Sequence, residues 1–129
     1  MAHFLSPLLR SPESVHAVRN QRTGRVLSTA LEAAFDSETR RRGLLGRDTM
    51  PAGSGLVIAP CSGIHTCFMR FPIDIIFAAR DGRVLSVRHR VAPWRLAISL
   101  RAFAVIELPG GSLENSDTQA GDALQIVVA

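Results

Sequence analysis

Most of the side chains that could do chemistry lie in one stretch, G-I-H-T-C-F-M-R-F-P-I-D-I-I-F, which runs from residue 63 to 77. His65, Cys67 and Met69 occupy alternate positions, so an extended backbone would place them on one face, about 7 Å apart. Imidazole, thiolate and thioether groups bind zinc or copper, but the spacing from Cys61, C-x3-H-x-C, matches no standard zinc site. We favour an ordinary core that buries Cys67 and Met69, and we expect no metal and no cofactor. Two alternatives stay open, a ligand pocket and a metal site completed by a fourth ligand from elsewhere in the chain.

Two carboxylates form the second candidate group. Asp74 opens an apolar run, and Glu107 shares a strand face with apolar neighbours. Burying an unpaired carboxylate is costly, so each should have a partner. The structural interpretation is an ion pair with an arginine such as Arg70 or Arg47, or hydrogen bonds from turn amides. The functional alternative is a pair that lines a pocket and binds a cation or acts in acid–base catalysis. The candidate ligand-binding residues are therefore His65, Cys67, Met69, Asp74 and Glu107.

The composition is that of a globular protein with a basic surface. The chain has 129 residues, 47% of them hydrophobic and 20% charged, which fits one domain with a self-sufficient core. Its formal charge is +4, and every basic residue is Arg. With one Trp and no Tyr to stack on bases, we expect nucleic-acid binding to be unlikely. The only arginine cluster, Arg40–Arg42, is also explained by a solvated helix face.

Other features bear on location. No apolar run approaches the roughly 20 residues of a membrane span, and no secretion signal is evident, so we expect a cytoplasmic protein without a membrane partner. In a reducing compartment Cys61 and Cys67 are expected to be free thiols rather than a disulfide. A Cys67 nucleophile paired with His65 is disfavoured, because side chains two residues apart on one strand rarely bring their reactive atoms together.

The turn signals predict many short strands. Residues 1–14 read as a loose tail that could dock Phe4 and Leu5, and residues 15–129 as a single domain. A hairpin around Gly24 and a short helix at 37–43 come first. Extended segments follow at 56–59, 64–71, 75–79, 85–91, 102–108 and 124–128, with an irregular connection after Pro93. We predict a mainly β fold, a single compact antiparallel sandwich or barrel-like domain with one short α-helix.

Six motifs in order resemble one family. They are R-R-G-L-L-G-R, G-L-V-I-A-P-C, I-H-T-C-F-M-R-F-P-I-D-I-I-F, D-G-R-V, V-I-E-L-P-G-G and A-G-D. Together they resemble domain of unknown function 192 (DUF192), from about residue 25 to the C-terminus. The resemblance implies one compact β-rich domain with a short helix and no agreed activity. Many members carry F-W-M-K-N-T where this chain has H-T-C-F-M-R-F, so Met69 keeps its place and Arg70 replaces a lysine.

Three functions remain as hypotheses. The first is a non-enzymatic module that binds a small ligand or peptide near His65, Met69, Asp74 and Glu107. The second is a small metal-dependent or histidine–carboxylate hydrolase that uses His65 with one of the carboxylates. The third is an arginine-mediated contact with RNA or an acidic protein through Arg40–Arg42 and Arg47.

Overall fold

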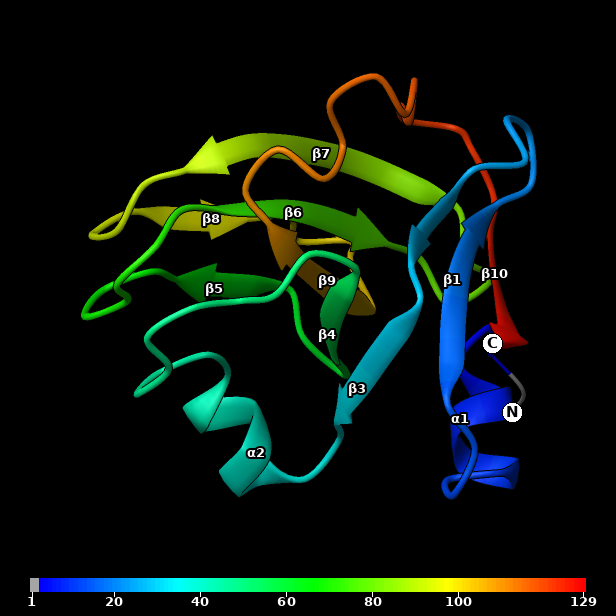
Figure 1. The fold of residues 1–129 in the computed structure, drawn as a ribbon, viewed down its shortest axis with the longest axis horizontal. Coiled ribbons are helices and arrows are strands. Elements are labelled where there is room, and N and C mark those ends of the chain that lie inside the picture. Colours follow the sequence, from blue (N-terminus) through cyan, green and yellow to red (C-terminus); the bar gives the residue numbers. More distant parts are fainter. Residues whose placement is uncertain (1–2) are drawn as a thin grey trace.

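The computed structural model describes residues 3–129, which form two short helices and ten strands (Figure 1). The helices are α1 (Ser6–Arg10) and α2 (Ser37–Arg42). The strands are β1 (His16–Asn20), β2 (Val26–Ser28), β3 (Ala30–Ala34), β4 (Ser54–Ile58), β5 (Gly63–His65), β6 (Ile73–Ala78), β7 (Val84–Val91), β8 (Leu96–Ile98), β9 (Ala104–Pro109) and β10 (Leu124–Val128).

Three sheets build the domain. The central sheet has five strands in the order β3-β4-β9-β6-β7, and it is antiparallel except for the parallel pair β3–β4. A three-stranded sheet, β10-β1-β2, and a two-stranded ribbon, β5–β8, complete the fold. The predicted mainly β class is confirmed, and the sheets of residues 3–129 form no closed barrel.

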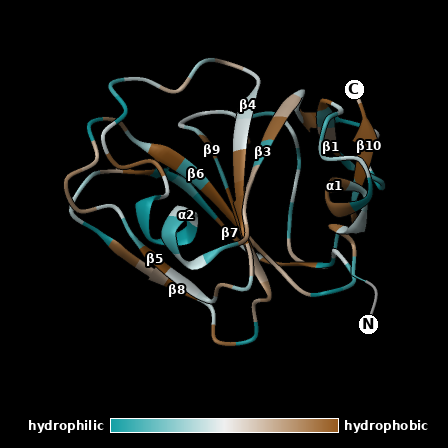
Figure 2. Cartoon of the chain, turned by 90° about the horizontal axis from the view of Figure 1, so that it is seen from below, coloured by the Kyte–Doolittle hydropathy of each residue, from teal (hydrophilic) through white to brown (hydrophobic). Residues whose placement is uncertain are grey.

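The central sheet buries apolar side chains on both of its faces. Every residue of β6 is buried, as its continuous apolar run predicted. One face packs towards α1 and the three-stranded sheet, with Ile76 and Ile106 among its core residues. The other face packs Ile75 and Phe77 towards the ribbon β5–β8 and the segment that follows α2. In Figure 2, β6 is largely brown, whereas α2 is mostly hydrophilic.

The helix expected at 37–43 is present. Asp36 caps α2 by accepting a hydrogen bond from the Thr39 amide at 2.8 Å, and Gly43 ends the helix with a φ of 49°. The connection that contains this helix joins the parallel strands β3 and β4. Parallel neighbours need such a crossover, and it brings the arginine-rich α2 to one face of the central sheet.

The fold contains two elements that the sequence did not predict. A second helix, α1, lies in the segment expected to be a loose tail, where Pro7 is compatible with the first turn and Leu5 is fully buried. The connection expected to be irregular after Pro93 contains the short strand β8. None of the helices in residues 3–129 is long and apolar enough to cross a membrane.

Candidate functional site

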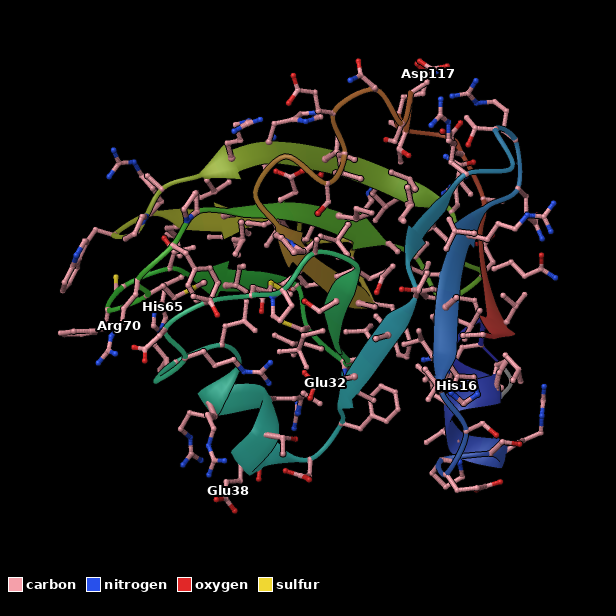
Figure 3. All side chains as sticks on the ribbon, in the orientation of Figure 1. His16, Glu32, Glu38, His65, Arg70 and Asp117 are labelled. Carbon is pink, nitrogen blue, oxygen red and sulfur yellow. The ribbon has the colours of Figure 1, made fainter. Side chains whose placement is uncertain are left out.

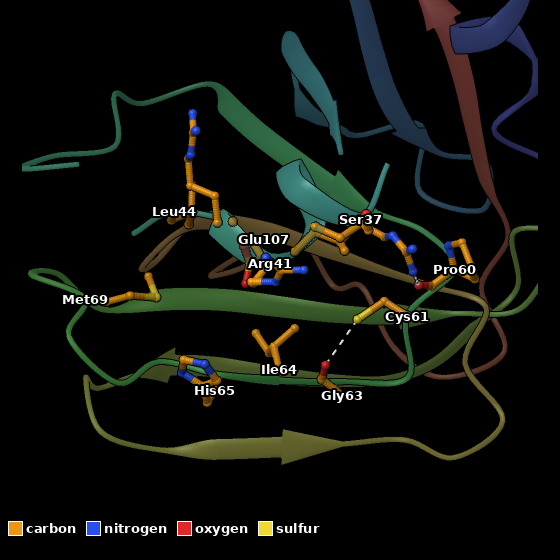
Figure 4. A pocket seen from close by; sticks show the side chains of 14 residues that line it. Ser37, Arg41, Leu44, Pro60, Cys61, Gly63, Ile64, His65, Met69 and Glu107 are labelled. Carbon is orange, nitrogen blue, oxygen red and sulfur yellow. Dashed lines mark hydrogen bonds between the residues drawn. The ribbon is translucent and has the colours of Figure 1, made fainter. Parts of the chain in front are cut away.

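A pocket of about 360 Å³ lies between α2, β5 and one face of the central sheet (Figure 4). Its apolar lining includes Leu44, Ile58, Ile64 and Met69. The buried carboxyl group of Glu107 also lines it. The pocket therefore combines an apolar wall with one deeply placed ionisable group, an arrangement typical of small-molecule sites.

Glu107 is positioned by the middle strand of the central sheet. On β9 it lies opposite Leu56 of β4 and Ile75 of β6, so strands cover it on both sides. The residue is only 3% exposed, and its Oε1 atom has no hydrogen-bond partner among residues 3–129. Burial raises the pKa of Glu107 to about 7, against the smaller opposing effect of Arg47. Arg47 itself pairs with Glu32 at 2.8 Å, and Glu107 forms no ion pair within the described range 3–129.

Three consecutive arginines of α2 line the same pocket. Arg40 donates a hydrogen bond to the Pro60 carbonyl at 3.1 Å, which ties the helix to the chain that leaves β4. Arg42 pairs with Glu38 one turn earlier, at 3.2 Å. Arg41 also lines the pocket. These side chains make the mouth of the pocket strongly positive, above a base that holds a carboxyl group.

Gly43 links the arginines to the carboxyl group. A Cβ atom added to Gly43 would lie 3.9 Å from Oε1 of Glu107 and 3.8 Å from Ile58. The helix therefore ends directly over Glu107. Gly43 has a φ of 49°, a backbone conformation that favours glycine and lets the chain turn at the end of the helix.

Cys61 lines the pocket beside the ribbon. Its thiol donates a hydrogen bond to the Gly63 carbonyl at 3.1 Å, shown as a dashed line in Figure 4. Burial is the main reason why the pKa of the Cys61 thiol is raised, and the negative charge of Glu107 adds to the effect. Both cysteines are free.

His65, Cys67 and Met69 do not share the predicted face. Strand β5 ends at His65, a turn closes with a bond from the Met69 amide to the Thr66 carbonyl, and Phe68 has a φ of 66°. His65 is exposed at the pocket edge, where its Nδ1 accepts a hydrogen bond from the Cys67 amide at 3.2 Å. Figure 3 shows His65 and Arg70 at one end of the molecule. Met69 is buried in the pocket wall, whereas Cys67 is not among the lining residues.

Asp74 lies on the other face of the sheet. Ile75 is opposite Glu107 in the ladder, and side chains alternate along a strand, so Asp74 and Glu107 point to opposite faces. The Asp74 carboxylate accepts hydrogen bonds from the amides of Arg90 at 2.8 Å, Gly111 at 3.1 Å and Leu113 at 2.7 Å. This arrangement corresponds to the structural interpretation, bonds from turn amides.

The site therefore unites some of the predicted residues and separates others. Glu107, Met69 and His65 line the pocket, and Cys67 and Asp74 do not. No hydrogen bond within residues 3–129 joins His65 to either carboxylate. The same residues contain no group of three or more His, Cys, Asp or Glu side chains that could hold a metal ion.

The sequence indicated Glu107, Met69 and His65 as candidates, but not the helix α2, which lines the same pocket. The arginine cluster Arg40–Arg42 left two interpretations open, a solvated helix face and a contact with RNA or an acidic protein, and nothing indicated that α2 and Glu107 meet. The missing signal was the parallel pairing of β3 with β4, which places the crossover helix over the sheet. The two strands are short and their connection is long, so the sequence pattern gave no sign of this pairing.

Comparison with known proteins shows the family and the fold. The family model DUF192, described as uncharacterized ACR, matches residues 18–126. A solved structure from Sinorhizobium meliloti 1021, titled a "putative transcription regulator", is 22% identical over 85% of this chain and 90% of that chain, with a TM-score of 0.74. A protein of unknown function from Novosphingobium aromaticivorans DSM 12444 is 23% identical over 85% of this chain and 82% of that chain, with a TM-score of 0.73. No curated protein gives a significant match.

Proposed function

The chain belongs to the DUF192 family, and we propose that it is a non-enzymatic module that binds a small molecule in the pocket beside Glu107. One observation carries the proposal: Oε1 of Glu107 is buried in the pocket lining without a hydrogen-bond partner among residues 3–129. Leaving a buried acceptor unpaired costs roughly 1–3 kcal/mol, and more when the group is charged. A bound ligand that donates a hydrogen bond to Glu107 would remove that cost.

The pocket also suggests the remaining chemistry of the ligand. An amine or hydroxyl group at the base would satisfy Glu107, and the apolar side chains of Ile58, Ile64 and Met69 would contact a short carbon skeleton. A carboxylate or phosphate at the mouth would meet the arginines of α2. We therefore propose a ligand with a hydrogen-bond donor at one end and an anionic group at the other.

The predicted site residues take unequal parts in this proposal. Glu107 recognises the ligand, Met69 forms part of the apolar wall, and His65 lies at the edge. Cys67 and Asp74 are left out, because neither lines the pocket. We keep the cytoplasm as the proposed location, which agrees with two cysteines that form no disulfide.

A titration with ω-amino acids tests the proposal. The probes are glycine, β-alanine, γ-aminobutyrate and ε-aminocaproate, which differ in the length between amine and carboxylate. Butyrate and n-butylamine each lack one of the two charged ends. Binding is followed by ¹H–¹⁵N correlation spectra at pH 8, where Glu107 is mostly ionised. The Glu107→Gln variant removes the charge, and Glu114→Gln, an exposed partner of Arg90, is the matched control.

We expect at least one probe to shift the amide signals of α2 and β9. The dissociation constant should rise about tenfold in Glu107→Gln, since about 1.4 kcal/mol is lost with a charged hydrogen bond, and should not change in Glu114→Gln. If no probe shifts these signals, or if the shifts are the same in Glu107→Gln, the proposal is wrong. Binding of n-butylamine alone would keep Glu107 as the recognition group and exclude the anionic end.

A further inference from the structure

A strip of exposed apolar side chains runs along β8, away from the pocket. Trp94, Leu96, Ile98 and Leu100 are 58%, 70%, 49% and 87% exposed, whereas Ala97 between them is 7% exposed. The alternation is that of a half-buried strand whose outward face is apolar instead of polar. Contiguous apolar surface of this kind marks an interaction site more often than single exposed residues do.

The free edge of β8 offers unpaired backbone groups. Strand β8 pairs only with β5 in the sheets of residues 3–129. Next to the strand, the Arg95 carbonyl accepts a hydrogen bond from the Thr66 amide, and the Ser99 amide donates to the Ser62 carbonyl, each at 2.8 Å. Because hydrogen-bonding positions alternate along an antiparallel strand, the amides and carbonyls of Leu96 and Ile98 point away from β5. They form a short open edge that can pair with another strand.

Two aromatic residues close one end of the strip. Phe68 and Trp94 lie with their ring centroids 4.5 Å apart, and they are 71% and 58% exposed. Both have a positive φ, 66° and 67°, which is uncommon for bulky residues. Strained backbone that presents large side chains to solvent tends to occur at functional sites.

Two exposed arginines flank the strip. Arg95 directly precedes β8, and Arg101 follows Leu100 at the other end of the strip. Neither forms an ion pair with another residue of the described range 3–129. This distribution is complementary to an acidic partner.

We propose that β8 docks an extended acidic segment of a partner protein, which adds a strand at the free edge and covers the strip with its apolar residues. A lipid surface fits less well, because unpaired backbone amides and carbonyls are costly in hydrocarbon. A second copy of the chain would bring Arg95 and Arg101 of both molecules to the same junction. This surface is independent of the Glu107 pocket.

A library of random heptapeptides displayed on phage is the probe. It is selected against the purified chain, and enriched peptides are then synthesised and titrated while the emission of Trp94, the single tryptophan, is recorded. Two variants test the surface. Ile98→Pro removes an amide that points away from β5, and Arg95→Glu with Arg101→Glu reverses the flanking charge. The charge control is Arg25→Glu in the β1–β2 turn. Circular dichroism checks that each variant is folded.

We expect the enriched peptides to alternate apolar residues and to carry Asp or Glu at their ends. Their binding should shift Trp94 emission to shorter wavelength and weaken at least tenfold in both test variants, with no change in Arg25→Glu. Selection without such a consensus, or binding that survives the double arginine variant, overturns the proposal. So does a Trp94 shift with phosphatidylglycerol vesicles and none with the peptides, or a concentration-dependent dimer whose formation depends on Ile98.

Discussion

Asp74 and Glu107 are two buried carboxyl groups on neighbouring strands, and their surroundings are opposite. Asp74 on β6 accepts three backbone amide hydrogen bonds and holds together the ends of β7 and β9. Glu107 on β9 has an oxygen, Oε1, without a hydrogen-bond partner among residues 3–129, and the pKa of this carboxyl group is raised to about 7. A buried carboxylate whose hydrogen bonds all come from the protein stabilises the fold. A buried carboxyl group with an unpaired oxygen destabilises the fold, and such a group is expected where a bound ligand supplies the missing hydrogen bond.

The difference follows from what covers each face of the sheet. Over Asp74 the chain from Gly110 to Leu113 turns tightly, so several amides point inward at once. Over Glu107 the covering segment is the end of α2, where Gly43 contributes no side chain and the arginines lie at the mouth of the pocket. Four experiments test this difference between the two faces of the sheet.

The largest effect is expected from Asp74→Ala. The variant leaves the amides of Arg90, Gly111 and Leu113 buried without an acceptor, so the free energy of unfolding should fall by about 4 kcal/mol. Asp74→Asn keeps one acceptor oxygen and should lose about 2 kcal/mol. Urea unfolding at pH 7 measures both. If Asp74→Ala loses less than Asp74→Asn, the amide bonds are not what holds this region together.

The second prediction is an increase in stability, produced by removing the charge of Glu107. The folded pKa of Glu107, about 7, lies above its ordinary value of 4.5, so the folded protein binds more protons than the unfolded chain between these values. Stability therefore falls as the pH rises through this window. Glu107→Gln removes the penalty and should be more stable than the wild type by about 3 kcal/mol at pH 8, with little difference at pH 4. Urea unfolding at the two pH values checks this, and a variant less stable at pH 8 would contradict it.

Asp122 is a third buried carboxylate, and unlike Glu107 it forms an ion pair. Its hydrogen bond with Arg22 at 2.6 Å, aided by Asn20 and the Gln119 amide, holds the pKa of Asp122 well below its usual range. The stability it contributes is present above the ordinary pKa of an aspartate and is lost as the pH falls through the lowered value. Asp122→Asn should cost about 1–2 kcal/mol at pH 7 and less at pH 3. Thermal unfolding at both pH values measures this loss of stability. An equal loss at pH 7 and pH 3 would show that the charge of Asp122 does not contribute to stability.

The smallest effect concerns Cys61, which reports on the charge of Glu107. Burial first, and then the Glu107 carboxylate, raise the pKa of the thiol, so alkylation by iodoacetamide at pH 8 should be slower than for an exposed cysteine. Removing the charge with Glu107→Gln should speed the reaction about twofold. Peptide mass spectrometry separates Cys61 from Cys67. An unchanged rate at Cys61 would show that Glu107 is not charged beside it.

The sequence predicted most of the fold because its signals are local. Strand β6 is indicated by a continuous apolar run, and α2 by its N-cap residue Asp36 and by Gly43 at its C-terminal end. Each signal depends on a few neighbouring residues, and the structure contains both elements. The predicted strand at 64–71 failed at Phe68, whose positive φ interrupts the extended backbone, and no local pattern indicates that φ. Strand β8 was missed because Pro93 and Trp94 precede it and because its outward-facing residues are apolar, so the sequence lacks the polar–apolar pattern of a half-buried strand.

The candidate site was harder to predict than the fold, because it depends on contacts between distant segments. The sequence indicated that Glu107 is buried or at a rim and needs a partner, but only the sheet register shows that it faces away from Asp74. The meeting of Glu107 with Arg40–Arg42 needs the crossover between two parallel strands. Such long-range pairing leaves little trace in the residue types of either segment.

Titration of Glu107 shows most directly whether the fold leaves this buried carboxyl group without a partner. The chain contains five glutamates, so the side-chain carboxyl signals of ¹³C-labelled glutamate can be assigned with Glu107→Gln and followed from pH 3 to 9. A Glu107 signal that titrates near pH 7 is the predicted result, and it would establish a buried carboxyl group without a protein partner. A midpoint at or below 4.5 would mean that the fold already satisfies Glu107, and the reason for placing a ligand there would be gone.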